Sequence, residues 1–70
     1  MDMITTYTYG LFDSHDTCID STNIDEENMD FAMELFKEFD KHEHYGITES
    51  SGHYVELLET VEEDYDPEEG

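Results

Sequence analysis

The hydrophobic residues in the middle of the chain recur at the spacing of an amphipathic helix. They form one stripe, which consists of Met29, Ala32, Met33, Leu35, Phe36 and Phe39. Charged side chains take the opposite face, as on a helix that packs against a core. Asp25 is a suitable N-cap, and Ile24 and Met29 have the spacing of a hydrophobic staple. The pattern predicts a helix from about Asp25 to Lys41.

β-Branched and aromatic residues dominate the segment before this helix. Residues 3–9 read Met-Ile-Thr-Thr-Tyr-Thr-Tyr, a composition that favours a strand ending near Gly10. Residues 17–19 form a second, shorter candidate strand. The Asp-Ser-Thr-Asn run at 20–23 is typical of a loop.

The region after the helix has the pattern of a β-hairpin. Two segments rich in β-branched and aromatic residues, 45–48 and 53–57, flank a polar four-residue connection that ends in Gly52. Residues 53–61 also fit one face of a helix, and periodicity alone does not distinguish the two. The upstream turn favours a strand. Residues 62–70 hold six acids and Pro67, and we expect them to be a flexible tail.

Taken together, these elements predict a small α+β fold. One amphipathic helix would pack on a small antiparallel sheet, in the chain order β(β)αββ. Residues 1–61 would form a single domain, and residues 62–70 an acidic tail. Nine aromatic residues and a single proline argue against disorder over the whole chain.

The net charge is the most unusual property of the sequence. Twenty-one acids stand against two lysines and no arginine, which gives −19 at pH 7 and a pI near 4.1. Direct binding to nucleic acid or to an anionic membrane needs clustered basic residues and is excluded. No apolar run is long enough to span a membrane, and the first residues lack the basic and apolar regions of a signal peptide. With Cys18 as the one cysteine, we expect a cytoplasmic protein.

Part of the charge falls into a regular row. The predicted helix carries acids at every fourth position, namely Glu26, Asp30, Glu34 and Glu38. Neighbours in this row are about 6 Å apart along the axis, and like charges at this spacing destabilise a helix. The predicted hairpin adds Glu49, Glu56 and Glu59. Solubility needs a net charge of only about 2–8 in a small domain, so these seven acids are the predicted partner-binding residues.

In size, in near absence of Lys and Arg, and in the acids Glu26, Asp30, Glu34 and Glu38 on one face, the chain resembles the small acidic DNA-mimic inhibitors of phages and mobile elements. Anti-CRISPR and anti-restriction proteins belong to this class. The resemblance covers composition and carries no family motif. It implies a non-enzymatic inhibitor that occupies the basic nucleic-acid-binding surface of a host defence or repair protein.

Other chemistry is poorly supported. The four histidines and Cys18 include ligand types that zinc accepts, but His15-x2-Cys18 and His42-x-His44 do not match a strong zinc signature. The calcium-binding EF-hand pattern and Gly-rich phosphate loops are absent. We therefore predict no catalytic residue, no metal site and no cofactor.

Two other roles use the same charge. The chain could be an acidic chaperone or antitoxin-like module that masks a basic protein partner, or an ordinary domain adapted to high salt. A homodimer is possible, because so small a core gains from a symmetric partner.

Overall fold

The computed structural model describes residues 2–65 and has the α+β architecture expected from the sequence. Strands β1 (Asp2–Phe12) and β2 (Cys18–Ile24) come first, followed by helix α1 (Met29–Glu43) and strand β3 (Tyr54–Tyr65). The chain order is therefore ββαβ, with one strand fewer after the helix than predicted.

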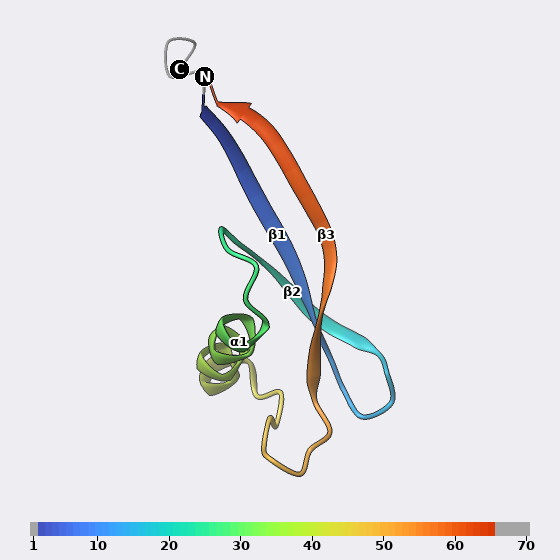
Figure 1. Cartoon of the computed structure of the whole chain (residues 1–70). Coiled ribbons are helices and arrows are strands. Elements are labelled where there is room, and N and C mark those ends of the chain that lie inside the picture. Colours follow the sequence, from blue (N-terminus) through green and yellow to red (C-terminus); the bar gives the residue numbers. More distant parts are fainter. Residues whose placement is uncertain (1, 66–70) are drawn as a thin grey trace.

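The three strands form one antiparallel sheet in the order β2-β1-β3 (Figure 1). β3 pairs with the whole of β1, from Asp2↔Tyr65 to Phe12↔Tyr54, whereas β2 pairs only with residues 7–12. Residues 2–6 of β1 and 61–65 of β3 therefore extend beyond the rest as a two-stranded ribbon. This ribbon accounts for an elongated shape of 47 × 21 × 17 Å.

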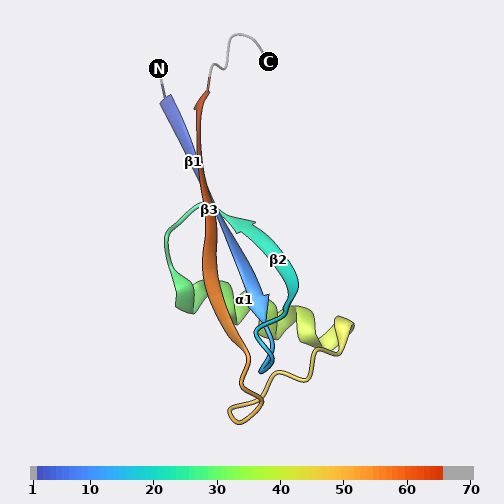
Figure 2. The same ribbon diagram turned by 90° about the vertical axis from the view of Figure 1, so that its right-hand side faces the viewer.

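Helix α1 covers one face of the sheet, and the view in Figure 2 looks onto the other face. Side chains from all four elements meet under the helix. The buried core comprises Tyr9, Leu11, Ile24, Ala32, Phe36 and Val55. Phe36 is fully buried, and its ring meets that of Phe39 edge-to-face at 5.9 Å. Of the stripe predicted for the helix, Ala32 and Phe36 are buried and Met33, Leu35 and Phe39 pack against the core, whereas Met29 is 51% exposed.

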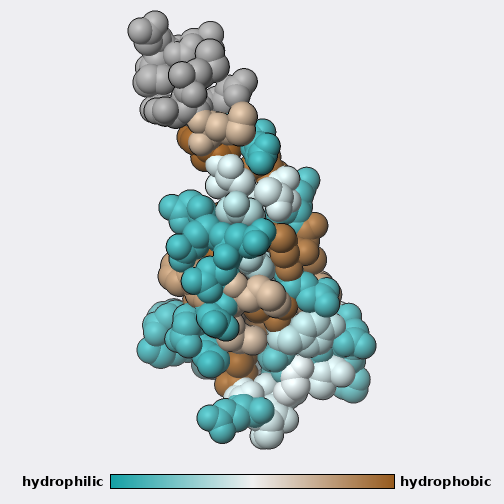
Figure 3. All heavy atoms as spheres, in the orientation of Figure 1, coloured by the Kyte–Doolittle hydropathy of each residue, from teal (hydrophilic) through white to brown (hydrophobic). Residues whose placement is uncertain are grey.

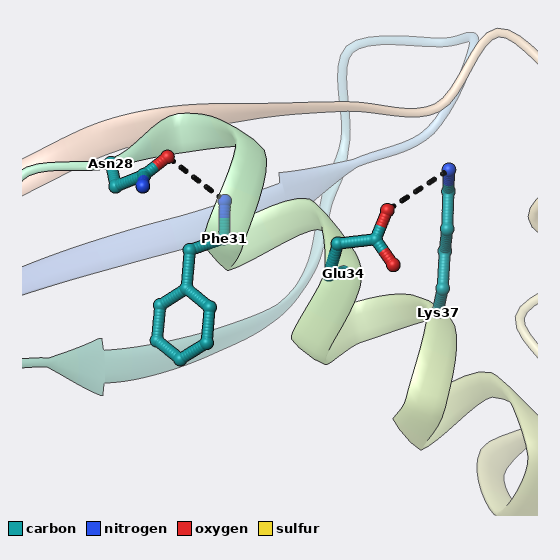
Figure 4. Close-up of polar contacts among 4 residues, drawn as sticks. All are labelled: Asn28, Phe31, Glu34 and Lys37. Atoms are coloured by element: carbon teal, nitrogen blue, oxygen red, sulfur yellow. Dashed lines mark hydrogen bonds and ion pairs between the residues drawn. The ribbon is translucent and has the colours of Figure 1, made fainter.

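The helix begins later than predicted. Asn28, not Asp25, is the N-cap, and its side-chain oxygen accepts the Phe31 N–H at 3.0 Å (Figure 4). Residues 25–27 therefore precede the helix. At the other end His44 adopts a left-handed conformation, with φ of 58°, and donates its N–H to the Asp40 carbonyl.

The predicted hairpin is wrong. Residues 45–48 form no strand, because the Asp40 carboxylate accepts the N–H groups of Gly46 at 2.8 Å and Ile47 at 3.1 Å. These bonds fold the segment back onto the end of the helix. The strand assignment of residues 53–61 is confirmed from Tyr54 onwards, but the partner of this strand is β1 at the other end of the chain.

β3 also continues four residues past the expected domain boundary. Residues 62–65, which we had placed in the flexible tail, pair with residues 2–5 of β1. Residues 66–70 of that tail lie outside the described residues. Backbone pairing to a continuous neighbour thus outweighs the low strand propensity of the acidic sequence.

The first two strands are longer than predicted. Residues 20–23, expected to be a loop, belong to β2, and Gly10 lies inside β1. A Cβ atom at Gly10 would lie 2.8 Å from Leu58 Cδ1 and 3.2 Å from the Phe12 ring. Leu58 is the extra residue of a bulge in β3, since Thr8 pairs with Glu59 and Tyr9 with Leu57. Gly10 thus makes room for the side chain at this bulge.

Candidate functional site

Some of the acids are engaged within the fold. One Asp13 carboxylate oxygen accepts the N–H of Thr17 at 3.0 Å and of His15 at 2.8 Å, which closes the turn between β1 and β2. These two hydrogen bonds, with that from Thr17 the stronger, lower the pKa of Asp13.

Asp40 has a similar role after the helix. Partial burial would raise the pKa of Asp40, but hydrogen bonds from the backbone of Gly46, Ile47 and Tyr45 together outweigh it and lower the pKa. The carboxylate therefore holds the loop that leads to β3.

Two further aspartates accept tyrosine hydroxyls. Tyr54 donates to Asp16 at 2.7 Å, and Tyr45 donates to Asp20. Each hydrogen bond to a carboxylate, helped by desolvation, raises the pKa of the tyrosine to about 12. These aspartates join segments that are distant in sequence, so they serve the fold rather than a partner surface.

The predicted row of acids on the helix is only partly formed. Glu26 lies before α1 and drops out of the row. Glu34 and Glu38 are exposed, but Lys37 Nζ lies 3.9 Å from Glu34 (Figure 4) and Lys41 Nζ lies 3.3 Å from Glu38. Such exposed pairs contribute only about 0–1 kcal/mol to stability. The two lysines nevertheless reduce the negative electrostatic field around Glu34 and Glu38. They are the only lysine or arginine residues in the chain.

The predicted hairpin acids do not lie together either. Glu49 is in the loop between α1 and β3, where it lines a hollow with Lys37 and His53. Glu56 and Glu59 are on β3, and both are exposed. The structure thus separates the acids near the two lysines from those on β3.

The pairing register shows which way the β3 acids point. Glu56, Glu59 and Glu63 lie opposite Gly10, Thr8 and Ile4 of β1. Tyr9 and Leu11 point into the core under the helix, so the even-numbered positions of β1 and their partners point away from it. Glu63 was missed in the sequence because we read it as part of a tail.

Further acids lie along the same strand. Glu62, opposite Thr5, points to the other side of β3. Glu27 and Asp30 line a hollow with Leu57 of β3, next to the start of the helix. β3 is an outer strand of the sheet. Exposed carboxylates lie on both faces of the sheet along this strand and beside it at the start of the helix. We call this set the β3 edge; it consists of Glu27, Asp30, Glu56, Glu59, Glu62 and Glu63.

The carboxylates of β3 follow one another at a spacing within about a factor of two of that of DNA phosphates. From Glu56 to Glu63 a strand rises about 23 Å, at roughly 3.3 Å per residue. The four acids from Glu56 to Glu63 give one charge per about 6 Å of this strand. A DNA strand carries one phosphate about every 3.4 Å along its axis. Neither lysine pairs with a member of the β3 edge.

The charges on β3 have a second explanation, which is protection of the exposed edge of the sheet. An outer strand exposes unpaired N–H and C=O groups, and charged side chains keep it from pairing with other chains. The acids Glu27 and Asp30, which lie outside the strand, are not explained by this protection.

The histidines and the cysteine were weighed in the sequence as zinc ligands, and the structure shows where several of them lie. His53 Nδ1 lies 2.7 Å from Ser51 Oγ, His15 is in the turn before β2, and the exposed Cys18 contacts the Asp20 carbonyl. Within the part of the chain that the structure describes, no three His, Cys, Asp or Glu side chains come together as metal ligands. Between residues 2 and 65 there is no helix with the length and apolar character needed to cross a membrane.

Comparison of the chain with known families, proteins and structures gives no match that informs function. No family model, curated protein or solved structure matches it. Function is therefore argued from the residues and their geometry, and the distinguishing feature of that geometry is the β3 edge.

Proposed function

We propose that this protein is a non-enzymatic inhibitor that binds the basic nucleic-acid-binding surface of another protein. The carboxylates of the β3 edge would take the place of phosphates. The observation that carries the proposal is the set of four exposed acids along about 23 Å of β3, with Glu27 and Asp30 beside Leu57 of the same strand and both lysines of the chain paired with other acids.

The electrostatics support this assignment over solubility alone. Residues 2–65 contain eighteen acids and two lysines, which leaves sixteen negative charges on a body 47 Å long. A protein that binds DNA places Lys and Arg opposite phosphates, and the same groups would pair with carboxylates at a similar spacing. Opposite net charges also accelerate the encounter of the two proteins.

Capture followed by displacement tests the proposal. The immobilised protein is incubated with host lysate at low salt, and bound proteins are challenged with duplex DNA of about 14 base pairs, which spans the same length as the protein. We expect nucleic-acid-binding proteins to be retained and then released by the duplex. Their affinity should also fall steeply as salt is raised.

The control is the same elution with an uncharged polymer, which should release nothing. Partners that saturating duplex DNA and RNA fail to displace would contradict nucleic-acid mimicry. Retention of a basic protein that binds no nucleic acid would instead indicate a module that masks a basic partner.

A further inference from the structure

The face of the sheet away from α1 carries a row of apolar side chains that is interrupted by Thr6 and Thr8 of β1. We call it the open face, and Figure 2 looks directly onto it. The virtual Cβ of Gly10 points to this face and meets the side chains of Leu58 and Phe12. Tyr54 stacks on Phe12, with ring centroids 5.2 Å apart and planes 7° from parallel. Ile4 shares the face, because it lies six positions before Gly10 on the same strand.

This row is accessible to a partner. Leu58 is 48% exposed and Ile4 is 46% exposed, and no element within residues 2–65 covers them. Hydrophobic side chains gather beside β3 in Figure 3, with hydrophilic ones around them. The acids on this face are Glu56, Glu59 and Glu63, so the apolar row is bordered by carboxylates of the β3 edge.

We infer that the open face docks an amphipathic helix of the partner, with an apolar stripe flanked by Lys or Arg. The inference rests on the proposed function and specifies the partner segment. The opposite face of the same sheet is covered by α1 through an apolar stripe, which is the usual way a sheet and a helix pack. The acidic border requires basic residues on the incoming helix.

The charges on the open face also argue against a second copy of this chain as the partner that docks there. The three acidic side chains of the open face have no lysine among them, so a symmetric dimer through this face would bring glutamates against glutamates. Like charges in an interface oppose association. A basic amphipathic helix satisfies both the apolar row and its acidic border.

The two kinds of contact respond differently to salt. Carboxylate pairs at the surface weaken as salt screens them, since the Debye length falls from about 10 Å at 0.1 M to about 3 Å at 1 M. Burial of apolar side chains is not screened by salt. Binding through the open face should therefore keep a salt-resistant part that pure phosphate mimicry lacks.

Two synthetic peptides of about 18 residues, five helical turns, test the inference. In the first, leucines form one stripe and lysines flank it. In the second, the same residues are arranged so that leucines are scattered around the helix. Binding to the full chain is measured by calorimetry at low and high salt. We expect equal charge-driven binding at low salt, and at high salt at least about a tenfold preference for the striped peptide.

Variants locate the contact. Ile4→Thr/Leu58→Thr should weaken high-salt binding of the striped peptide by about tenfold, and Ile4→Thr alone by less. The matched control is Ile19→Thr/Phe31→Gln, which changes two apolar residues of 37% and 39% exposure that line hollows beside helix α1. It should leave binding unchanged. Circular dichroism verifies that each variant is folded.

Each contrary result has a distinct meaning. If both peptides bind equally at high salt and the open-face variants change nothing, the docking inference is wrong while the electrostatic function stands. If neither peptide binds even at low salt, the proposed function fails as well. If sedimentation shows a dimer that Leu58→Thr dissociates, a second copy occupies the face and the inference is overturned.

Discussion

Gly52 connects the loop before β3 to the turn between β1 and β2, and its replacement by alanine tests this contact. Gly52 has a φ of +83°, and an added Cβ would lie 2.8 Å from Ser14 Cβ and 3.4 Å from Ser14 Cα. Gly46, in the same loop, has a similar φ of +77° but nothing within 4 Å of an added Cβ. Both substitutions therefore place an alanine in a left-handed backbone conformation. Only Gly52→Ala also creates a close contact with Ser14.

The magnitudes follow from these two terms. A left-handed conformation costs an L-residue about 1–2 kcal/mol. Loss of glycine freedom in the unfolded chain offsets about 0.4–1 kcal/mol of it. Gly46→Ala should thus lower the free energy of unfolding by about 1 kcal/mol. Gly52→Ala adds overpacking against Ser14, typically about 1–3 kcal/mol, for a total of about 2–4 kcal/mol.

Urea and thermal unfolding followed by circular dichroism measure both variants. The difference of about 1–3 kcal/mol should separate their Tm values by at least about 4 °C in a domain of this size. Ser14→Gly should restore most of the stability lost in Gly52→Ala, because it removes the Cβ that is contacted. If the two alanine variants agree within about 0.5 kcal/mol, the loop does not pack on the turn.

Three further predictions concern the core and the engaged carboxylates. Phe36→Ala should cost about 3–5 kcal/mol in urea unfolding, and the half-exposed Phe31→Ala much less. The pKa of Asp13 is lowered in the folded protein, so its carboxylate stabilises the fold at pH values above its ordinary pKa of 3.8. The difference in unfolding free energy between wild type and Asp13→Asn should therefore shrink as the pH falls through the folded-state pKa of Asp13. A pH-independent difference would contradict this role. The pKa of Tyr54, raised to about 12, favours the fold below pH 10, and this contribution is lost as pH rises through 12. In an ultraviolet titration, Asp16→Asn should move the phenolate transition of Tyr54 back toward 10, and an unchanged transition would show that Asp16 is not the cause.

Local sequence patterns predicted the helix and the strands better than they predicted which strands pair with each other. The apolar stripe of α1 was readable because its periodicity is strong. The strand after it was predicted from an upstream turn signal, because its own periodicity also fits a helix. The hairpin was wrong because nothing local shows that Asp40 captures the N–H groups of Gly46 and Ile47. Pairing of β3 with β1 depends on contacts between the two ends of the chain, which no short window contains.

The sequence predicted an acidic surface, but it assigned some of the acids to the wrong elements. Glu56 and Glu59 were identified correctly as exposed acids of a strand, whereas Glu62 and Glu63 were assigned to the tail because acidic runs have low strand propensity. The helical row lost Glu26 because the helix is capped by Asn28, three residues after the predicted cap Asp25.

The central claim is that the β3 edge, and not net charge alone, binds the partner. Two triple variants that each remove three charges separate these alternatives. Glu56→Gln/Glu59→Gln/Glu63→Gln neutralises the open-face acids of the β3 edge. The control, Glu34→Gln/Glu38→Gln/Glu43→Gln, neutralises three exposed acids of α1 that are not part of the β3 edge.

The deciding measurement is equilibrium competition of each variant with labelled duplex DNA for a captured partner. The account predicts that the β3 triple variant loses about tenfold or more in competing strength and shows a shallower salt dependence. The helix triple variant should stay within about threefold of wild type, because two of its three acids are already paired with lysine. Equal loss in both variants, or a larger loss in the helix variant, would contradict the account.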